Sequence, residues 1–281
     1  MRFRSMILDV INSGSKGNCY ILHNNQEALV LECGEPIKKV VNILNGTSMI
    51  KGCLITHEHS DHADYTKQYV MRGVPCCSTV GTATILADKG KGGEYINTLP
   101  IGAVKKLGGF IVMPFRTFHD YPSVRAVEPC GYLISHEETG VVLFATDTHH
   151  IEGSFKDLIN VMRTNALSNE NLKDVVIDDY VSNIMIESNY KMSFLEKNFA
   201  DGIIDKRRAE RTIQTHFSLE NCIETLKSND LSNVNNIVLL HLSQENANEY
   251  LFWGEVSKAT NKKVYVAKKG LQLINLDKIK K

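Results

Sequence analysis

The sequence lacks several features that would place it in a specialised class of protein. No run approaches the roughly 18 continuous apolar residues that span a bilayer, and no apolar signal segment follows Met1. The chain also has no charge excess, because 32 lysines and arginines balance 32 aspartates and glutamates. Any contact with nucleic acid must therefore depend on a local basic patch. We expect no membrane association and a cytoplasmic location.

Paired cysteine motifs and linkers are missing as well. The seven cysteines are odd in number and contain no C-x-x-C pair, which argues against a disulfide framework and favours reduced thiols. No Pro/Gly/Ser-rich linker or low-complexity tract divides the chain. We expect one domain spanning residues 1–281, and the sequence leaves open whether the protein is a homo-oligomer.

Short apolar strands alternate with polar turns and helical stretches along both halves of the chain. Apolar runs predict strands at Met6–Val10, Cys19–Leu22, Ala28–Glu32, Cys53–Thr56, Pro75–Ser78, Phe110–Phe118, Gly131–Ser135, Val141–Ala145, Val175–Ile177, Asn183–Ser188, Ile237–Leu240 and Lys263–Ala267. Helical periodicity predicts helices at Glu35–Leu44, Asp64–Arg72, Thr82–Lys89 and Phe155–Val161, and two between residues 190 and 230, the second at Leu219–Lys227. This order predicts an α/β (α+β) fold with two packed sheets and outer helices.

The strongest chemical signal is the run His57-x-His59-x-Asp61-His62, which directly follows a predicted strand. Three imidazoles and a carboxylate in six residues cannot all be core residues, because unpaired polar groups are costly to bury. Such a loop can direct its side chains at shared cations, and the ligand types suit zinc or manganese. A solvated, histidine-rich loop is the alternative.

Further ligand candidates follow other predicted strands. His119, Asp147 and His241 each come directly after an apolar strand, where a sheet edge can present side chains to a common cleft. Any one of them alone is more often a structural polar residue. With the histidine run they form a set large enough for two cations about 3.5–4 Å apart.

These residues resemble the metallo-β-lactamase fold hydrolases. The resemblance also covers Ala145-Thr146-Asp147-Thr148. Within this family the sequence most resembles the YycJ (WalJ) branch, which is similar to RNase Z. The motifs that carry this resemblance extend from residue 12 to about 246. They are Ser13-Gly14-Ser15-Lys16-Gly17-Asn18, Gly131-Tyr132, Ile186-Glu187-Ser188-Asn189, Lys206-Arg207-Arg208, His216-Phe217-Ser218 and His241-Leu242-Ser243-Gln244-Glu245-Asn246. The chain departs from the family at Thr215, where a small residue is usual, and over residues 180–215.

The resemblance implies an αββα sandwich of two mixed sheets, with two divalent metal ions in a cleft at one sheet edge. It assigns His57, His59 and His119 to one ion and Asp61, His62 and His241 to the other, with Asp147 between them. Zinc and manganese fit this ligand set, and iron is possible. A water or hydroxide held between the ions would be the nucleophile, in a site that includes Asp61. The family is known for phosphodiester cleavage, and YycJ-type proteins for exonuclease action on DNA.

Two other sets of residues bear on the reaction. His216 resembles the histidine near the leaving group in RNase Z-like sites, so we expect it to protonate or stabilise the leaving oxygen with support from Glu187. An ordinary helix-capping histidine is the alternative. The basic run Lys206, Arg207 and Arg208 could bind a phosphate, as could Ser15 and Asn18 in the glycine-rich turn. A solvated helix face and a simple hairpin loop are the respective alternatives.

The leading hypothesis is a metal-dependent hydrolase of nucleic-acid phosphodiesters, most plausibly a DNA exonuclease. The balanced charge keeps a small or cyclic nucleotide as a competing substrate. Hydrolysis of a thioester or another ester is a third alternative on the same fold. A non-catalytic metal-binding protein is the fourth, although such a protein would be expected to have lost ligands.

Overall fold

The described strands form two mixed sheets that lie face to face. The computed structural model describes residues 5–119, 128–273 and 275–278. In this part of the chain, the first sheet has the order β14-β1-β2-β3-β4-β5-β6 and the second the order β13-β12-β11-β10-β9-β8-β7.

The strands of the first sheet are β1 (Ile7–Asn12), β2 (Cys19–His23), β3 (Ala28–Leu31), β4 (Ile50–Leu54), β5 (Cys76–Ser78), β6 (Asn97–Thr98) and β14 (Gln272–Leu273). Those of the second are β7 (Lys105–Leu107), β8 (Phe110–Arg116), β9 (Cys130–His136), β10 (Gly140–Ala145), β11 (Val181–Glu187), β12 (Asn236–Leu240) and β13 (Lys263–Val266). The α-helices are α1 (Ile37–Leu44), α2 (Ser60–Ala63), α3 (Thr66–Val70), α4 (Val80–Asp88), α5 (Phe155–Leu167), α6 (Met192–Ala200), α7 (Lys206–Thr215), α8 (Leu219–Lys227) and α9 (Glu249–Thr260). A 3-10 helix covers Gly93–Tyr95.

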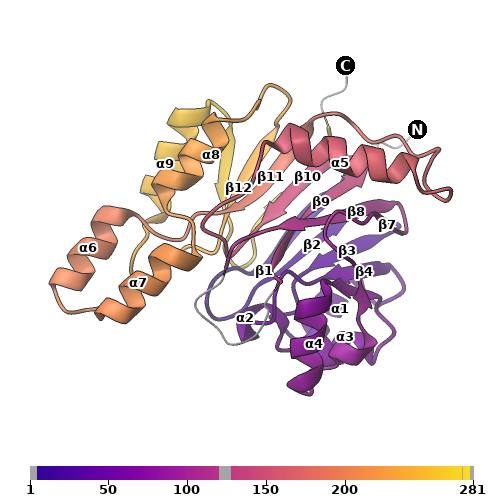
Figure 1. Ribbon diagram of the computed structural model, residues 1–281, viewed down its shortest axis with the longest axis horizontal. Helices are drawn as coiled ribbons and strands as arrows, with labels where there is room; N and C mark the ends of the chain where they lie inside the picture. Colours follow the sequence, from indigo (N-terminus) through magenta and orange to yellow (C-terminus); the bar gives the residue numbers. More distant parts are fainter. Residues whose placement is uncertain (1–4, 120–127, 274, 279–281) are drawn as a thin grey trace.

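Three apolar layers explain why most strands are buried on both faces. Leu8, Leu54 and Phe144 belong to a layer to which both sheets contribute. Helices α1, α3 and α4 cover the outer face of the first sheet, and α5, α8 and α9 cover that of the second. The result is the four-layer αββα arrangement expected from the sequence, and Figure 1 shows it with α6 and α7 extending away from the sheets. Burial of these apolar surfaces is the main stabilising contribution to such a sandwich.

The sequence-based assignment was wrong in two places. Residues 175–177 form no strand: the Val175 N–H bonds back to Leu172 O at 2.9 Å, and Val176 is 86% exposed. Residues 190–230 contain three helices (α6, α7 and α8) rather than two. Helix α9 and the short strands β6, β7 and β14 had not been predicted. The predicted strands at 53–56 and 110–118 end earlier, at Leu54 and Arg116, which leaves the residues beyond them free to turn.

All seven cysteines are buried and free, so none is a surface thiol. Among the helices of the described residues, none combines the length and apolarity that a bilayer-spanning segment needs.

Candidate metal centre

The histidine run begins where β4 leaves the first sheet. The Ile55 N–H still bonds to Cys77 O at 3.0 Å, and the chain then turns so that His57 and His59 precede α2. Asp61 and His62 lie within α2, a single helical turn, rather than on the open loop that the sequence had suggested. The helical turn is closed by the His62 N–H, which donates to His59 O at 3.0 Å.

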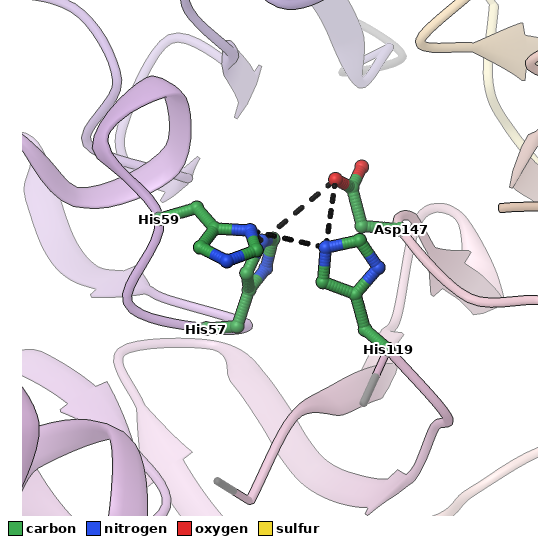
Figure 2. Close-up of side chains that lie close together, drawn as sticks. All are labelled: His57, His59, His119 and Asp147. Carbon is green, nitrogen blue, oxygen red and sulfur yellow. Dashed lines mark hydrogen bonds and ion pairs between the residues drawn. The ribbon is translucent and has the colours of Figure 1, made fainter. Parts of the chain in front are cut away.

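Four ligand atoms of His57, His59, His119 and Asp147 lie within 4.8 Å of one another. Figure 2 shows these side chains, from three separate loops, pointing toward one another. His59 Nδ1 lies 3.1 Å from His57 Nε2 and 3.0 Å from His119 Nε2. Asp147 Oδ2 lies 3.7 Å from His57 Nε2 and 3.5 Å from His119 Nε2. We call these four residues the first ligand group.

The histidines of the first ligand group favour the neutral form that binds metals. Burial lowers the pKa of His57 well below its ordinary value, and the neighbouring His62 and His119 lower it further. Burial likewise lowers the pKa of His119 to about 3. Neutral imidazoles that face one another bring their nitrogen lone pairs together, and these lone pairs repel. A cation bound between them would remove that repulsion.

A second ligand group consists of Asp61, His62, Asp147 and His241, whose ligand atoms also lie within 4.8 Å of one another. Asp61 Oδ2 is 3.4 Å from His62 Nε2 and 3.3 Å from His241 Nε2. Asp147 Oδ1 is 3.4 Å from His62 Nε2, whereas Oδ2 faces the first group. Asp147 is therefore shared by the two groups, one oxygen to each.

The second ligand group needs positive charge between its carboxylates. Burial opposes protonation of His241, yet Asp147, Asp61 and Glu187 together raise its pKa to about 10. Burial also opposes protonation of His62, and Asp147 and Asp61 overcome it, so that the His62 pKa lies well above its ordinary value. Protons on the imidazoles or divalent cations can neutralise these buried carboxylates. The donor set of nitrogen and oxygen atoms fits zinc, manganese or iron at both groups.

Outer contacts orient the ligands. His119 Nδ1–H donates to Thr215 O at 2.7 Å. His62 Nδ1 lies 3.6 Å from Oε1 of Glu32, a fully buried carboxylate whose Oε2 accepts the Thr56 N–H at 3.3 Å. A carboxylate or carbonyl behind a histidine fixes its tautomer and raises its basicity as a ligand. Sequence reasoning had not identified Glu32, because it ends a predicted apolar strand and belongs to no recognised motif.

Left-handed backbone conformations mark the same region. Outside glycine, positive φ angles in the described residues occur at three asparagines and at Glu32 (69°), Asp147 (46°) and His241 (54°). Few non-glycine residues adopt this conformation, and those that do are concentrated at functional sites. The three residues other than asparagine are two ligand candidates and the carboxylate behind a third. Each of them lies one or two residues beyond the end of a strand, at β3, β10 or β12.

We expect Glu32→Gln to weaken binding at the second ligand group by about tenfold or more, because the amide no longer offers a negative charge to His62. Metal content after titration with a chelator would measure this, with Glu152→Gln as the matched control on an exposed glutamate. If Glu32→Gln and the control retained both metals equally, Glu32 would not support metal binding through His62.

The glycine-rich turn supports Asp61 through Asn18 and reaches the cleft surface at Ser15. Asn18 is fully buried, its N–H donates to Asp61 O at 2.6 Å, and its Oδ1 accepts the Gly14 N–H at 2.8 Å. Its Nδ2 lies 3.4 Å from Asp61 Oδ2. A Cβ at Gly34 would lie only 1.8 Å from Asp61 O, so only glycine allows this approach. Of the two residues predicted to bind substrate here, Ser15 lines the cleft and Asn18 does not.

A cleft of about 360 Å³ opens over both ligand groups. His216 lines it, and its Nδ1 donates to Glu187 Oε1 at 2.7 Å. Glu187 is fully buried, and its Oε2 accepts the N–H groups of Thr148 and Phe217 at 3.0 and 3.1 Å. The buried carboxylate therefore fixes the His216 ring, and no described residue bonds its Nε2.

The basic run on α7 is only partly at the cleft. Lys206 and Arg207 do not line it, and Lys206 pairs with Glu210. Arg208 lines it but pairs with Glu245 at 2.6 Å. Arg211, one turn further along, lines the cleft and forms no ion pair with a described residue. The helical period explains this difference, because residues 208 and 211 share one face of α7.

No protein-family model matches the sequence, and no curated protein matches it. Solved structures are similar throughout the chain. The metallo-β-lactamase fold protein YhfI from Bacillus subtilis has a TM-score of 0.63 and 14% identity, over 95% of this chain and 99% of its own. A diphosphatase of the PhnP family has a TM-score of 0.60 and 14% identity, over 96% and 97%. The short form of human tRNase Z has a TM-score of 0.55 and 12% identity, over 95% and 98%. The chain has the metallo-β-lactamase fold.

Proposed function

We propose that this protein is a dinuclear metal-dependent phosphodiesterase that acts on nucleic acid as a DNA exonuclease. The observation that carries the proposal is the sharing of Asp147 by two ligand groups, each of four residues, under one cleft. His57, His59 and His119 would hold one cation and Asp61, His62 and His241 the other, with Asp147 between them. When bound, two such cations supply a nucleophile from water at neutral pH and neutralise the charge of a phosphate.

The residues around the ligands suit a phosphodiester better than an uncharged ester. Arg211 presents a cation at the cleft, where a guanidinium can bind phosphate oxygens in a bidentate manner. Ser15 lines the same cleft and offers a hydroxyl. His216, held by Glu187, can give a proton to the leaving oxygen from its Nε2. The sequence resemblance to the YycJ (WalJ) branch supports DNA as the substrate.

A small or cyclic nucleotide is the second candidate substrate. Glu245 lines the cleft and neutralises Arg208, which lowers the attraction for a polyanion. A cleft of about 360 Å³ is also small, at the lower end of ligand pockets.

A substrate panel tests the proposal. Purified protein with manganese or zinc is expected to hydrolyse bis-p-nitrophenyl phosphate and to shorten labelled linear DNA, while Asp61→Ala loses both activities. Cyclic nucleotides, single strands and duplexes complete the panel, with metal analysis of the same preparation. Activity on small nucleotides alone would contradict the proposal that the protein is a nuclease. The absence of any phosphodiester hydrolysis with two bound ions would contradict the whole proposal and favour a thioesterase or a metal-binding protein.

A further inference from the structure

A second hollow, of about 530 Å³, lies between α3 and the turn that follows α4. Four cationic side chains line it, those of Lys67, Arg72, Lys89 and Lys91. Asp64 is the only carboxylate among its described lining residues. We call this hollow the α3–α4 basic pocket. Its cations come from two segments, so the sequence shows no dense basic run there.

Close backbone packing shapes the pocket. Gly92 has a φ of 87°, and a Cβ there would lie 3.1 Å from Lys67 Cα. The turn before it is closed by the Lys91 N–H, which donates to Leu86 O at 2.8 Å. The turn that carries two of the lysines is therefore held against α3.

Most of this charge is available to a ligand. Lys91 Nζ pairs with Asp64 Oδ1 at 2.6 Å. No ion pair joins Lys67, Arg72 or Lys89 to another residue in the described ranges, and both Lys67 and Arg72 are exposed. In a chain whose formal net charge is zero, this cluster is a local positive potential that the bulk charge does not reveal.

The pocket adjoins the ligand loop. Lys89 Nζ donates to the carbonyl of Glu58, the residue between His57 and His59, at 3.4 Å. Helix α3 follows α2 after only two residues. In Figure 1, α2 lies between α7 on one side and α3 and α4 on the other. Helix α7, which carries Arg211, and the segments that line the α3–α4 basic pocket thus lie on either side of α2 in this view.

We propose that the α3–α4 basic pocket binds backbone phosphates of a nucleic-acid strand whose scissile bond lies at the metal centre. This inference rests on the proposed function and specifies it, because simultaneous contacts at the metal centre and in the pocket require a strand that carries several phosphates. The substrate is then a polymer. Phosphate contacts of this kind give affinity without sequence preference.

Direct binding tests the pocket separately from catalysis. A fluorescently labelled single-stranded oligonucleotide is titrated in chelator, so that no cleavage occurs, at several salt concentrations. Lys67→Gln/Arg72→Gln is expected to weaken binding about tenfold and to reduce the salt slope by about 0.7 for each lost phosphate contact. Lys156→Gln/Lys227→Gln, at exposed positions of α5 and α8, is the matched control. Affinity and slope equal to those of wild type would overturn the inference.

Further measurements separate the possible failures. With metal present, the variant's loss in kcat/KM should be about tenfold greater for the oligonucleotide than for bis-p-nitrophenyl phosphate. If the wild-type protein hydrolysed bis-p-nitrophenyl phosphate but bound no oligonucleotide, the inference about the pocket would be wrong. The proposed phosphodiesterase activity would be unaffected by that result. Pocket-dependent binding without any hydrolysis would overturn the proposed function. Pocket-dependent binding to phosphatidylglycerol vesicles but not to oligonucleotides would assign the pocket to lipid headgroups and also overturn the inference.

Discussion

Replacing Asp147 with asparagine is expected to lower hydrolysis of bis-p-nitrophenyl phosphate by at least about 10⁴-fold, because bound water then loses the activation that two cations provide. The two Asp147 oxygens face different ligand groups, Oδ1 toward His62 and Oδ2 toward His119. An amide has one oxygen and no charge, so it cannot serve both groups. Metal analysis should show fewer than two ions per chain.

A matched substitution separates this effect from a general loss of charge. Asp201 is an exposed aspartate at the end of α6 that pairs with Lys197. Asp201→Asn should keep full activity and metal content. If Asp147→Asn retained two ions and near-normal turnover, Asp147 would not be the shared ligand, and the arrangement proposed for the centre would be wrong.

Replacing His216 with alanine is expected to slow cleavage of DNA about 10²–10⁴-fold while leaving two metals bound. The side chain lines the cleft and is held by Glu187. A sugar alkoxide is a poor leaving group that needs a proton, whereas p-nitrophenolate leaves without one. The loss should therefore be much smaller for bis-p-nitrophenyl phosphate, and that difference marks a proton donor rather than a structural histidine.

His150→Ala is the control for His216→Ala, since His150 is exposed and does not line the cleft. Glu187→Gln should reproduce part of the His216 defect and change the pH profile, because the ring keeps its position but loses its charged partner. An equal loss on both substrates, or loss of metal from His216→Ala, would assign the residue a role in maintaining the site.

The ligand candidates could be predicted from sequence because each follows an apolar strand. Such strands must be buried, and the polar residue after them must lie at a sheet edge. For example, His119 lies three residues beyond the end of β8, and His241 directly follows β12. The pairing of strands then brings together residues that are far apart in the chain. The alternation of strands and helices predicted two packed sheets with outer helices, whereas the αββα sandwich was implied by the family resemblance.

The supporting contacts could not be predicted, because they depend on backbone turns between distant segments. Asn18 looked like a loop residue available to substrate, yet it is buried against Asp61. Glu32 looked like the end of a strand, yet its buried carboxylate lies 3.6 Å from His62 Nδ1. The basic run on α7 looked dense in sequence, but only Arg208 of that run lines the cleft, and Glu245 pairs with it. Arg211, outside the run, presents its charge at the cleft without an ion pair to a described residue.

The ligand candidates come from both sheets: His57 to His62 follow a strand of the first, whereas His119, Asp147 and His241 follow strands of the second. Bound cations would therefore join the two halves of the sandwich at one edge. A ligand present at a thousand times its dissociation constant adds about 4 kcal/mol to stability. That is a large part of the roughly 5–15 kcal/mol typical of a folded domain. Cellular metal supply would then influence how much of this protein survives proteolysis, as well as how fast each molecule turns over.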